Sequence, residues 1–164
     1  MEERFLPYHL ALDYIQEPYD RRVLPRVFLS VELFPGQDVT VTTSIVLDTG
    51  APVSVLDGNV ALQAGWMPED IVGRATNAFP IYGIGPGAAI PGYLHEIKGY
   101  LGSYGRFAVL KLRVLITMPG RLAFSVLGRS DFFEQVDVTF AETDRKLYFR
   151  FRDASVLRSY TNSV

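Results

Sequence analysis

An aspartate, a hydroxyl residue and a glycine follow directly after an apolar run, and this order is the part of the sequence best suited to chemistry. The run covers residues 44–47 and leads into Asp48, Thr49 and Gly50. A carboxylate at the end of a buried strand can take a proton from water, and glycine lets the backbone turn sharply and approach a bound molecule closely. The pattern predicts a catalytic carboxylate.

Hydrolysis by carboxylates alone needs a second acid, because one group must take a proton from water while another gives a proton to the bond being broken. Three other aspartates are candidates within the chain: Asp57, Asp131 and Asp137. Each has a plainer interpretation, as a helix cap, a first-turn acid and a surface strand residue respectively. The partner of Asp48 is therefore expected from elsewhere.

The elements that must position Asp48 are mostly strands. Residues 27–33 and 39–47 are rich in β-branched and aromatic residues and flank a Pro-Gly turn, so they predict a hairpin that delivers Asp48. Further strands are expected at 93–100 and 107–117, and a closing hairpin at 136–140 and 146–151. Two short helices are expected. One covers 60–64, with Asp57 near its start and Gly65 at its end, and the other covers 130–135, with Ser130 as its N-cap.

Two later segments join the first motif to make a more specific pattern. An apolar pair followed by Gly-Arg stands at residues 126–129, and a glycine-rich stretch at residues 81–87 lies between the two motifs. With Asp-Thr-Gly-Ala at residues 48–51, this order resembles the retropepsin-like aspartic proteases, which include retroviral proteases and small bacterial and archaeal relatives. The resemblance spans roughly residues 27–151. It implies an all-β fold, a closed β-barrel or sandwich with a glycine-rich flap hairpin and one or two short helices.

The resemblance also implies how the site works. Such enzymes are symmetric dimers, so Asp48 would face its twofold mate and Thr49 would hydrogen-bond across the axis. Catalysis would then rest on Asp48, Thr49 and Gly50, and the implied substrate-binding residues are Ala51, Tyr82, Gly83, Ile84, Gly85 and Val126. Arg129 would support the active-site loop. The chain departs from many viral relatives at Pro52, where they carry an acid, and at Pro86 in the flap, where they carry glycine.

Composition excludes several other functions. The 164-residue chain is 48% hydrophobic with a net charge of −2 and no long basic run, so it favours one domain that does not bind nucleic acid. It contains no cysteine, and His9 and His95 lack ligand spacing, so neither a metal nor another cofactor is expected. Its acidic start and lack of a long apolar run predict a cytoplasmic protein without a membrane partner.

We divide the chain into an N-terminal arm or irregular edge strand at residues 1–22, a retropepsin-like domain at 23–152 and a C-terminal tail at 153–164. The leading hypothesis is a homodimeric aspartic endopeptidase that cleaves extended peptides or proteins. The alternative is a non-catalytic retropepsin-like module for peptide binding or dimerisation, since a fold does not establish a function. A third hypothesis is a monomeric β-barrel in which the motif arose by chance.

Overall fold

The computed structural model describes residues 8–15, 24–33, 39–83, 87–103 and 105–159. Strands dominate this part of the chain and the helices are few and short, so the predicted fold class is confirmed. The strands are β1 (Leu10–Asp13), β2 (Arg26–Glu32), β3 (Val41–Leu47), β4 (Ser54–Leu56), β5 (Asn77–Ile81), β6 (Ile90–Ser103), β7 (Arg106–Ile116), β8 (Ser125–Leu127), β9 (Val136–Ala141), β10 (Lys146–Phe151) and β11 (Leu157–Ser159). The helices are α1 (Gly58–Gln63), α2 (Pro68–Gly73), a π-type turn (Arg129–Phe133) and a 3-10 turn (Ala154–Val156).

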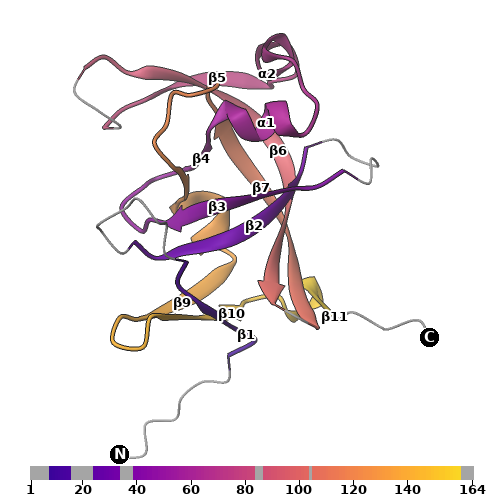
Figure 1. The fold of residues 1–164 in the computed structure, drawn as a ribbon, viewed down its shortest axis with the longest axis vertical. Coiled ribbons are helices and arrows are strands. Elements are labelled where there is room, and N and C mark those ends of the chain that lie inside the picture. Colours follow the sequence, from indigo (N-terminus) through magenta and orange to yellow (C-terminus); the bar gives the residue numbers. More distant parts are fainter. Residues whose placement is uncertain (1–7, 16–23, 34–38, 84–86, 104, 160–164) are drawn as a thin grey trace, which may run out of the picture.

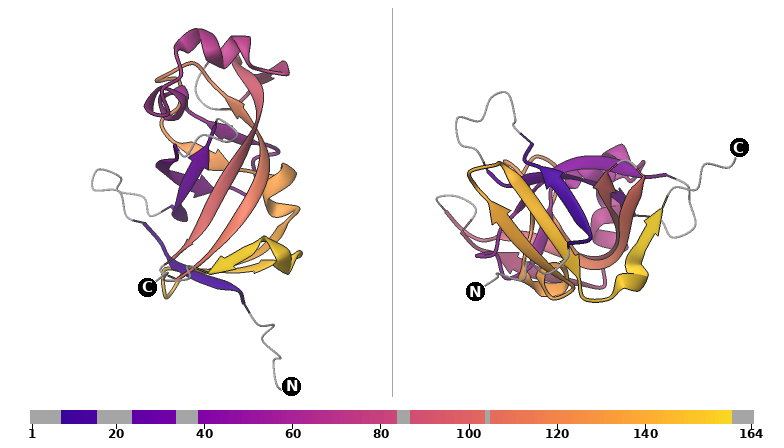
Figure 2. Two further views of the ribbon diagram at one scale, coloured as in Figure 1. Left: turned by 90° about the vertical axis from the view of Figure 1, so that its right-hand side faces the viewer. Right: turned by 90° about the horizontal axis from the view of Figure 1, so that it is seen from below.

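The larger sheet closes into a barrel. Its strands follow the order β7, β4, β8, β3, β2 and β6, and β6 pairs back onto β7 to complete the ring. β5 extends the sheet beyond β6, and β11 pairs with the other edge of β7. A separate small sheet has the order β1, β10, β9. Figure 1 and the left view of Figure 2 show β5, α1 and α2 at one end and the small sheet with β11 at the other.

Apolar side chains on the inward face of each strand fill the barrel. On β7, buried Ala108, Leu110 and Leu112 alternate with residues that face outward, among them exposed Lys111 and Arg113. Successive strand residues point to opposite faces of a sheet, so this pattern places an apolar stripe inside the ring. The same arrangement on the neighbouring strands gives the main core, and Val55, Ile81 and Leu115 form a smaller, separate cluster.

The two predicted hairpins are confirmed. β2 pairs antiparallel with β3 from Arg26↔Val46 to Val31↔Val41, and β9 pairs antiparallel with β10. The first hairpin brings the end of β3 to the residue before Asp48, as expected. The strands predicted at 93–100 and 107–117 form the long pair β6 and β7, which extends a few residues beyond the prediction on β6.

The helices agree with prediction only in part. α1 begins two residues earlier than expected, and the carboxylate of Asp57 accepts a hydrogen bond from the Asn59 N–H at 3.0 Å, as a helix cap does. The helix predicted at 130–135 is wrong in form. Ser130 has extended backbone angles, and Asp131 has a φ of 66°, so the segment is a broken π-type turn without a serine cap. α2 was not predicted.

Parts of both flanking segments pair with the sheets. Within the predicted arm, β1 pairs with β10, and Leu10 is buried in the core. Within the predicted tail, β11 pairs with β7, and Val156 and Leu157 pack partly buried against the core. Among the described residues, no helix has the length and apolar character needed to cross a membrane.

Candidate active site

Asp48 lies at the end of β3, and its backbone is held by the second motif. β3 pairs parallel with β8, and the Asp48 N–H donates to the Leu127 carbonyl at 3.0 Å, one residue beyond the last paired position. Leu47 is buried, whereas Asp48, Thr49 and Gly50 are exposed. The chain therefore fixes the main chain of Asp48 while leaving its side chain open to solvent.

A tight turn sets the direction of the Asp48 carboxylate. Its Oδ1 accepts a hydrogen bond from the Gly50 N–H at 2.8 Å, and its carbonyl accepts one from the Ala51 N–H at 3.2 Å. A Cβ at Gly50 would lie 3.1 Å from the same Oδ1, closer than ordinary van der Waals contact. Glycine is thus the residue that leaves this oxygen undisturbed.

The second motif is bonded to the residues that follow Asp48. The Arg129 N–H donates to the Ala51 carbonyl at 2.9 Å, and the Ser130 N–H donates to the Pro52 carbonyl at 3.0 Å. The buried hydroxyl of Ser54 accepts from the Gly128 N–H at 3.0 Å. The Arg129 side chain is exposed and forms no hydrogen bond or ion pair with other described residues, so the hydrogen bond that Arg129 makes to the loop comes from its main chain.

A cavity of about 490 Å³ opens in front of Asp48. Its described lining comes from the Asp48 loop, from β4, from the end of β5, from β7 and from the segment leading into β8: Asp48, Gly50, Ala51, Pro52, Val53, Val55, Pro80, Ile81, Tyr82, Gly83, Leu115, Leu122, Ala123, Phe124 and Val126. This chiefly apolar lining around one acid is typical of a binding cleft.

The cavity contains six of the nine residues expected at the site, namely Asp48, Gly50, Ala51, Tyr82, Gly83 and Val126. Thr49 is exposed beside it and is not part of the described lining. Ile84 and Gly85, like Pro86, lie outside the described residues. The predicted flap corresponds to the hairpin of β5 and β6, paired from Asn77↔Leu94 to Ile81↔Ile90. The side chain of Tyr82 at its end is 75% exposed.

The other aspartates considered from the sequence have partners of their own. The carboxylate of Asp131 binds the Arg113 guanidinium through two hydrogen bonds of 2.8 and 3.1 Å, and these lower the pKa of Asp131. Hydrogen bonding to Arg150 likewise lowers the pKa of Asp137. Asp57 is buried and accepts main-chain hydrogen bonds. Among the described residues that line the cavity, Asp48 is the one carboxylate.

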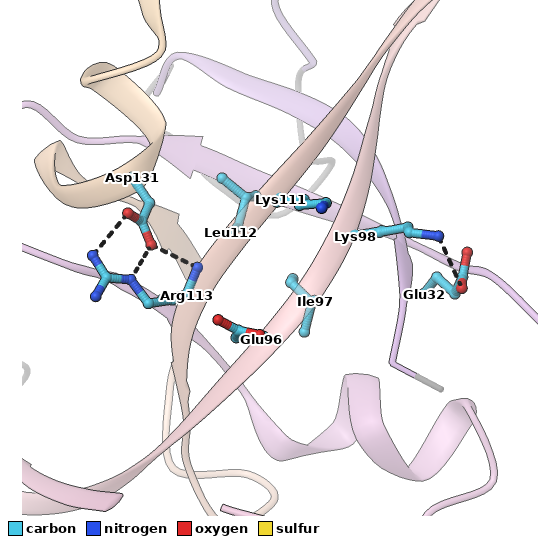
Figure 3. A pocket seen from close by; sticks show the side chains of 8 residues that line it. All are labelled: Glu32, Glu96, Ile97, Lys98, Lys111, Leu112, Arg113 and Asp131. Atoms are coloured by element: carbon cyan, nitrogen blue, oxygen red, sulfur yellow. Dashed lines mark hydrogen bonds and ion pairs between the residues drawn. The ribbon is translucent and has the colours of Figure 1, made fainter. Parts of the chain in front are cut away.

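A second cavity, of about 360 Å³, lies against β6 and β7 (Figure 3) and carries several charged side chains. At one end Arg113 binds Asp131, and at the other the Lys98 ammonium lies 3.8 Å from a carboxylate oxygen of Glu32. These pairs neutralise most of the charge near the cavity. Glu96 and Lys111 are the other charged side chains of its described lining.

The histidines have structural surroundings. The Nδ1 of His9 accepts from the Phe151 N–H at 3.0 Å, and the Nε2 of His95 donates to the Ile71 carbonyl at 2.8 Å. Burial lowers the pKa of His95, while the bond to Ile71 opposes that shift in part. The described part of the chain holds no group of histidine and acidic side chains that could bind a metal ion.

Sequence reasoning missed the side of the cavity formed by Leu122, Ala123 and Phe124. These residues form no periodic element and carry no motif, so their position depends on contacts far away in the sequence. Phe124 stands two residues before the second motif in the sequence, and this was the one signal that could have placed it near the site.

No protein-family profile matches this chain, and no curated protein matches it. Among solved structures, 28 chains match. One is EIAV protease complexed with the inhibitor HBY-793, with 17% identity, a TM-score of 0.43 and coverage of 73% of this chain and 93% of that chain. Another is a retropepsin-like aspartic protease from Rickettsia conorii, with 15% identity, a TM-score of 0.49 and coverage of 77% and 90%.

Proposed function

We propose that this chain is an aspartic endopeptidase that works as a homodimer, with two copies of Asp48 activating one water molecule. The observation that carries the proposal is the position of Asp48, exposed at the end of a buried strand and the one carboxylate in the described lining of its cavity. Among the described residues, the cavity lacks the second acid that this chemistry needs. A second copy of the same loop supplies it.

The proposed reaction follows from the charge on the pair. Two carboxylates about 3 Å apart do not both ionise readily, so they share one proton, as in aspartic proteases. The ionised Asp48 takes a proton from water while the water oxygen bonds to the scissile carbonyl carbon, and the protonated Asp48 gives its proton to the carbonyl oxygen. The C–N bond of the resulting diol then breaks as the nitrogen takes a proton from one Asp48 and a diol hydroxyl gives a proton to the other Asp48, so the pair again holds one shared proton. The products are a carboxylic acid and an amine.

The exposed loop supports the proposed assembly. Thr49 and Gly50 are exposed in the single chain although they follow a fully buried strand end. In a twofold dimer the same patch on each copy meets its mate, so exposure of this loop is what a free protomer would show. Thr49 would then lie near the axis and hold the two loops together.

The cavity lining supports an extended peptide as substrate. Ala51 and Val126 lie on the side of the Asp48 loop, and Tyr82 and Gly83 follow the last paired residue of β5 in the flap hairpin. A peptide between them would place alternate side chains against apolar walls, since side chains of a strand point in opposite directions. We infer that Ile84 and Gly85 in the flap complete this contact.

Incubation of the full chain with a mixed peptide library at mildly acidic pH tests the proposal. The wild-type protein should cleave peptides internally, and Asp48→Asn should abolish cleavage because the amide neither takes a proton from water nor gives one to the carbonyl oxygen. Asp153→Asn, which alters an aspartate that caps the 3-10 turn, serves as the control that keeps activity. Sedimentation should show dimers of both variants.

The same experiment separates the other hypotheses. Cleavage that persists in Asp48→Asn contradicts the mechanism. A wild-type dimer that binds peptides without cleaving them at any pH favours the binding module. A strictly monomeric protein at high concentration leaves Asp48 without its partner and contradicts both.

A further inference from the structure

The segment of residues 120–124, here called the wall segment, separates two cavities. Its residues Leu122, Ala123 and Phe124 line the Asp48 cavity on one side and a cavity of about 520 Å³ on the other. The cavity behind the wall segment has a more polar lining that includes Arg26 and Asp57. The wall segment therefore has open space on both sides. The contacts that fix its position also set the width of the Asp48 cavity.

The carboxylate of Asp57 holds the wall segment by two hydrogen bonds. Its Oδ1 accepts from the Gly120 N–H at 3.2 Å, and its Oδ2 accepts from the Leu122 N–H at 3.0 Å. Asp57 is only 8% exposed, so these bonds are shielded from water. Its own N–H donates to the Ser125 hydroxyl at 3.0 Å, just beyond the other end of the segment.

Two further contacts fix the approach to the wall segment. A Cβ at Gly58 would lie 2.3 Å from the Thr117 carbonyl oxygen and 2.7 Å from the Pro119 nitrogen, so the chain packs directly on the start of α1. On the far side, the guanidinium of Arg26 lies 5.5 Å from the centre of the Phe124 ring. Asp57 directly precedes Gly58 and accepts the hydrogen bonds from the first and the middle residue of the segment, Gly120 and Leu122.

We infer that Asp57 is a positioning residue that sets the width of the Asp48 cavity and thereby selects which peptide side chains the cavity accepts. The inference rests on the proposed function. Without the bond from the Leu122 N–H, the wall segment is free to move into the cavity behind it. The Asp48 cavity then widens, and discrimination against large substrate side chains is lost.

Asp57→Ser tests this role without removing the helix cap. Serine is itself a good N-cap and can still accept from the Asn59 N–H, but its shorter side chain has a single oxygen and does not reach Leu122. Asp57→Asn is the second variant, because it keeps the length of the side chain and replaces one acceptor oxygen by an NH2 group, which cannot accept a hydrogen bond. Asp153→Asn is the matched control, because its carboxylate accepts from the Ser155 N–H at 2.9 Å away from the cavity.

Amide hydrogen exchange provides the first measurement. Loss of a hydrogen bond to a charged acceptor should speed exchange of the Leu122 amide about tenfold or more in Asp57→Ser and Asp57→Asn. The Val60 amide within α1 should keep its protection in Asp57→Ser. Unchanged exchange at Leu122 in both variants overturns the inference.

Selectivity provides the second measurement. Two decapeptides that differ only by Ala or Phe before the scissile bond give a ratio of kcat/KM, and this ratio should shift about tenfold toward Phe in the Asp57 variants, mainly through KM. Asp153→Asn should leave the ratio unchanged. A ratio that stays constant in both Asp57 variants also overturns the inference.

Failure of the proposed function is recognised separately, because the wild-type protein would then cleave neither peptide. Calorimetric binding of the same two peptides then replaces the kinetic ratio. Faster exchange at Leu122 together with a binding preference shifted toward Phe still supports the positioning role of Asp57. Unchanged exchange or unchanged preference still overturns it.

Discussion

Gly128 is the point at which the second motif touches the Asp48 loop, and Gly128→Ala tests how strongly this contact fixes the loop. A Cβ at this position would lie 2.3 Å from the Val53 carbonyl oxygen and 2.9 Å from the Ala51 carbonyl oxygen. The shorter distance is about 1 Å below the ordinary contact distance of 3.4 Å. Both obstructing atoms are backbone, so no side-chain rotation relieves the overlap.

The expected loss of stability follows from the two backbone segments that the added Cβ would push apart. Separating the two segments weakens the hydrogen bonds from Gly128 to Ser54, from Arg129 to Ala51 and from Ser130 to Pro52. At about 1 kcal/mol for each bond, with about 1 to 2 kcal/mol for the overlap, the free energy of unfolding falls by about 4 to 5 kcal/mol. For a chain of this size the melting temperature then falls by roughly 10 °C.

Denaturant unfolding at fixed protein concentration measures this loss, with Gly73→Ala as the matched control. Gly73 is the last residue of α2, and a Cβ there meets nothing within 4 Å. Alanine at that position should leave stability unchanged or raise it by up to about 1 kcal/mol. A destabilisation of Gly128→Ala by less than about 1 kcal/mol would refute the reasoning, because the loop would then tolerate displacement.

The remaining predictions concern the loop and the core. Gly50→Ala should lower peptide cleavage at least about tenfold with little change in melting temperature, because its Cβ displaces the Asp48 carboxylate by a few tenths of an ångström. Ser54→Ala should cost about 1 to 3 kcal/mol in denaturant unfolding, because the Gly128 N–H is left buried without an acceptor. Since burial lowers the pKa of His95, the neutral ring stabilises the fold above pH 6.5, and stability falls as the pH decreases from 6.5 toward the folded-state pKa. Unfolding at pH 7.5 and 5.5 should show this fall in the wild type and a smaller one in His95→Gln.

The hairpins could be predicted because their signal is local. β2 and β3 each consist of residues that favour strands, and the sequence between them contains Pro35 and Gly36, which favour a turn. The position of Asp48 follows from the end of β3. By contrast, the wall segment has no local signal, since Leu122 is held by a carboxylate 65 positions away.

Two short helical segments show why local patterns fail. Ser130 followed by two phenylalanines has the composition of a capped helix, but the bidentate bond between Arg113 and Asp131 holds the chain in an extended and then left-handed conformation. A contact with Arg113 on β7 thus overrides the local preference. α2 is too short for a clear apolar period, although Pro68 at its first turn and Asp70, which accepts from the Met67 N–H at 2.8 Å, were available signals.

In the Asp48 loop, the backbone is fixed by hydrogen bonds, whereas the side chains of Asp48 and Thr49 are exposed. The hydrogen bonds that fix its backbone come from β8 and the second motif, on the side that faces the barrel. The Asp48 side chain and Thr49 point away from that support and remain exposed. Each chain therefore fixes the backbone of Asp48 through contacts on its interior side and leaves the Asp48 carboxylate at its surface. Hydrolysis between carboxylates needs two such groups at a fixed separation. In the proposed dimer, rigid backbone support on each copy would therefore let a second copy complete the site without further rearrangement.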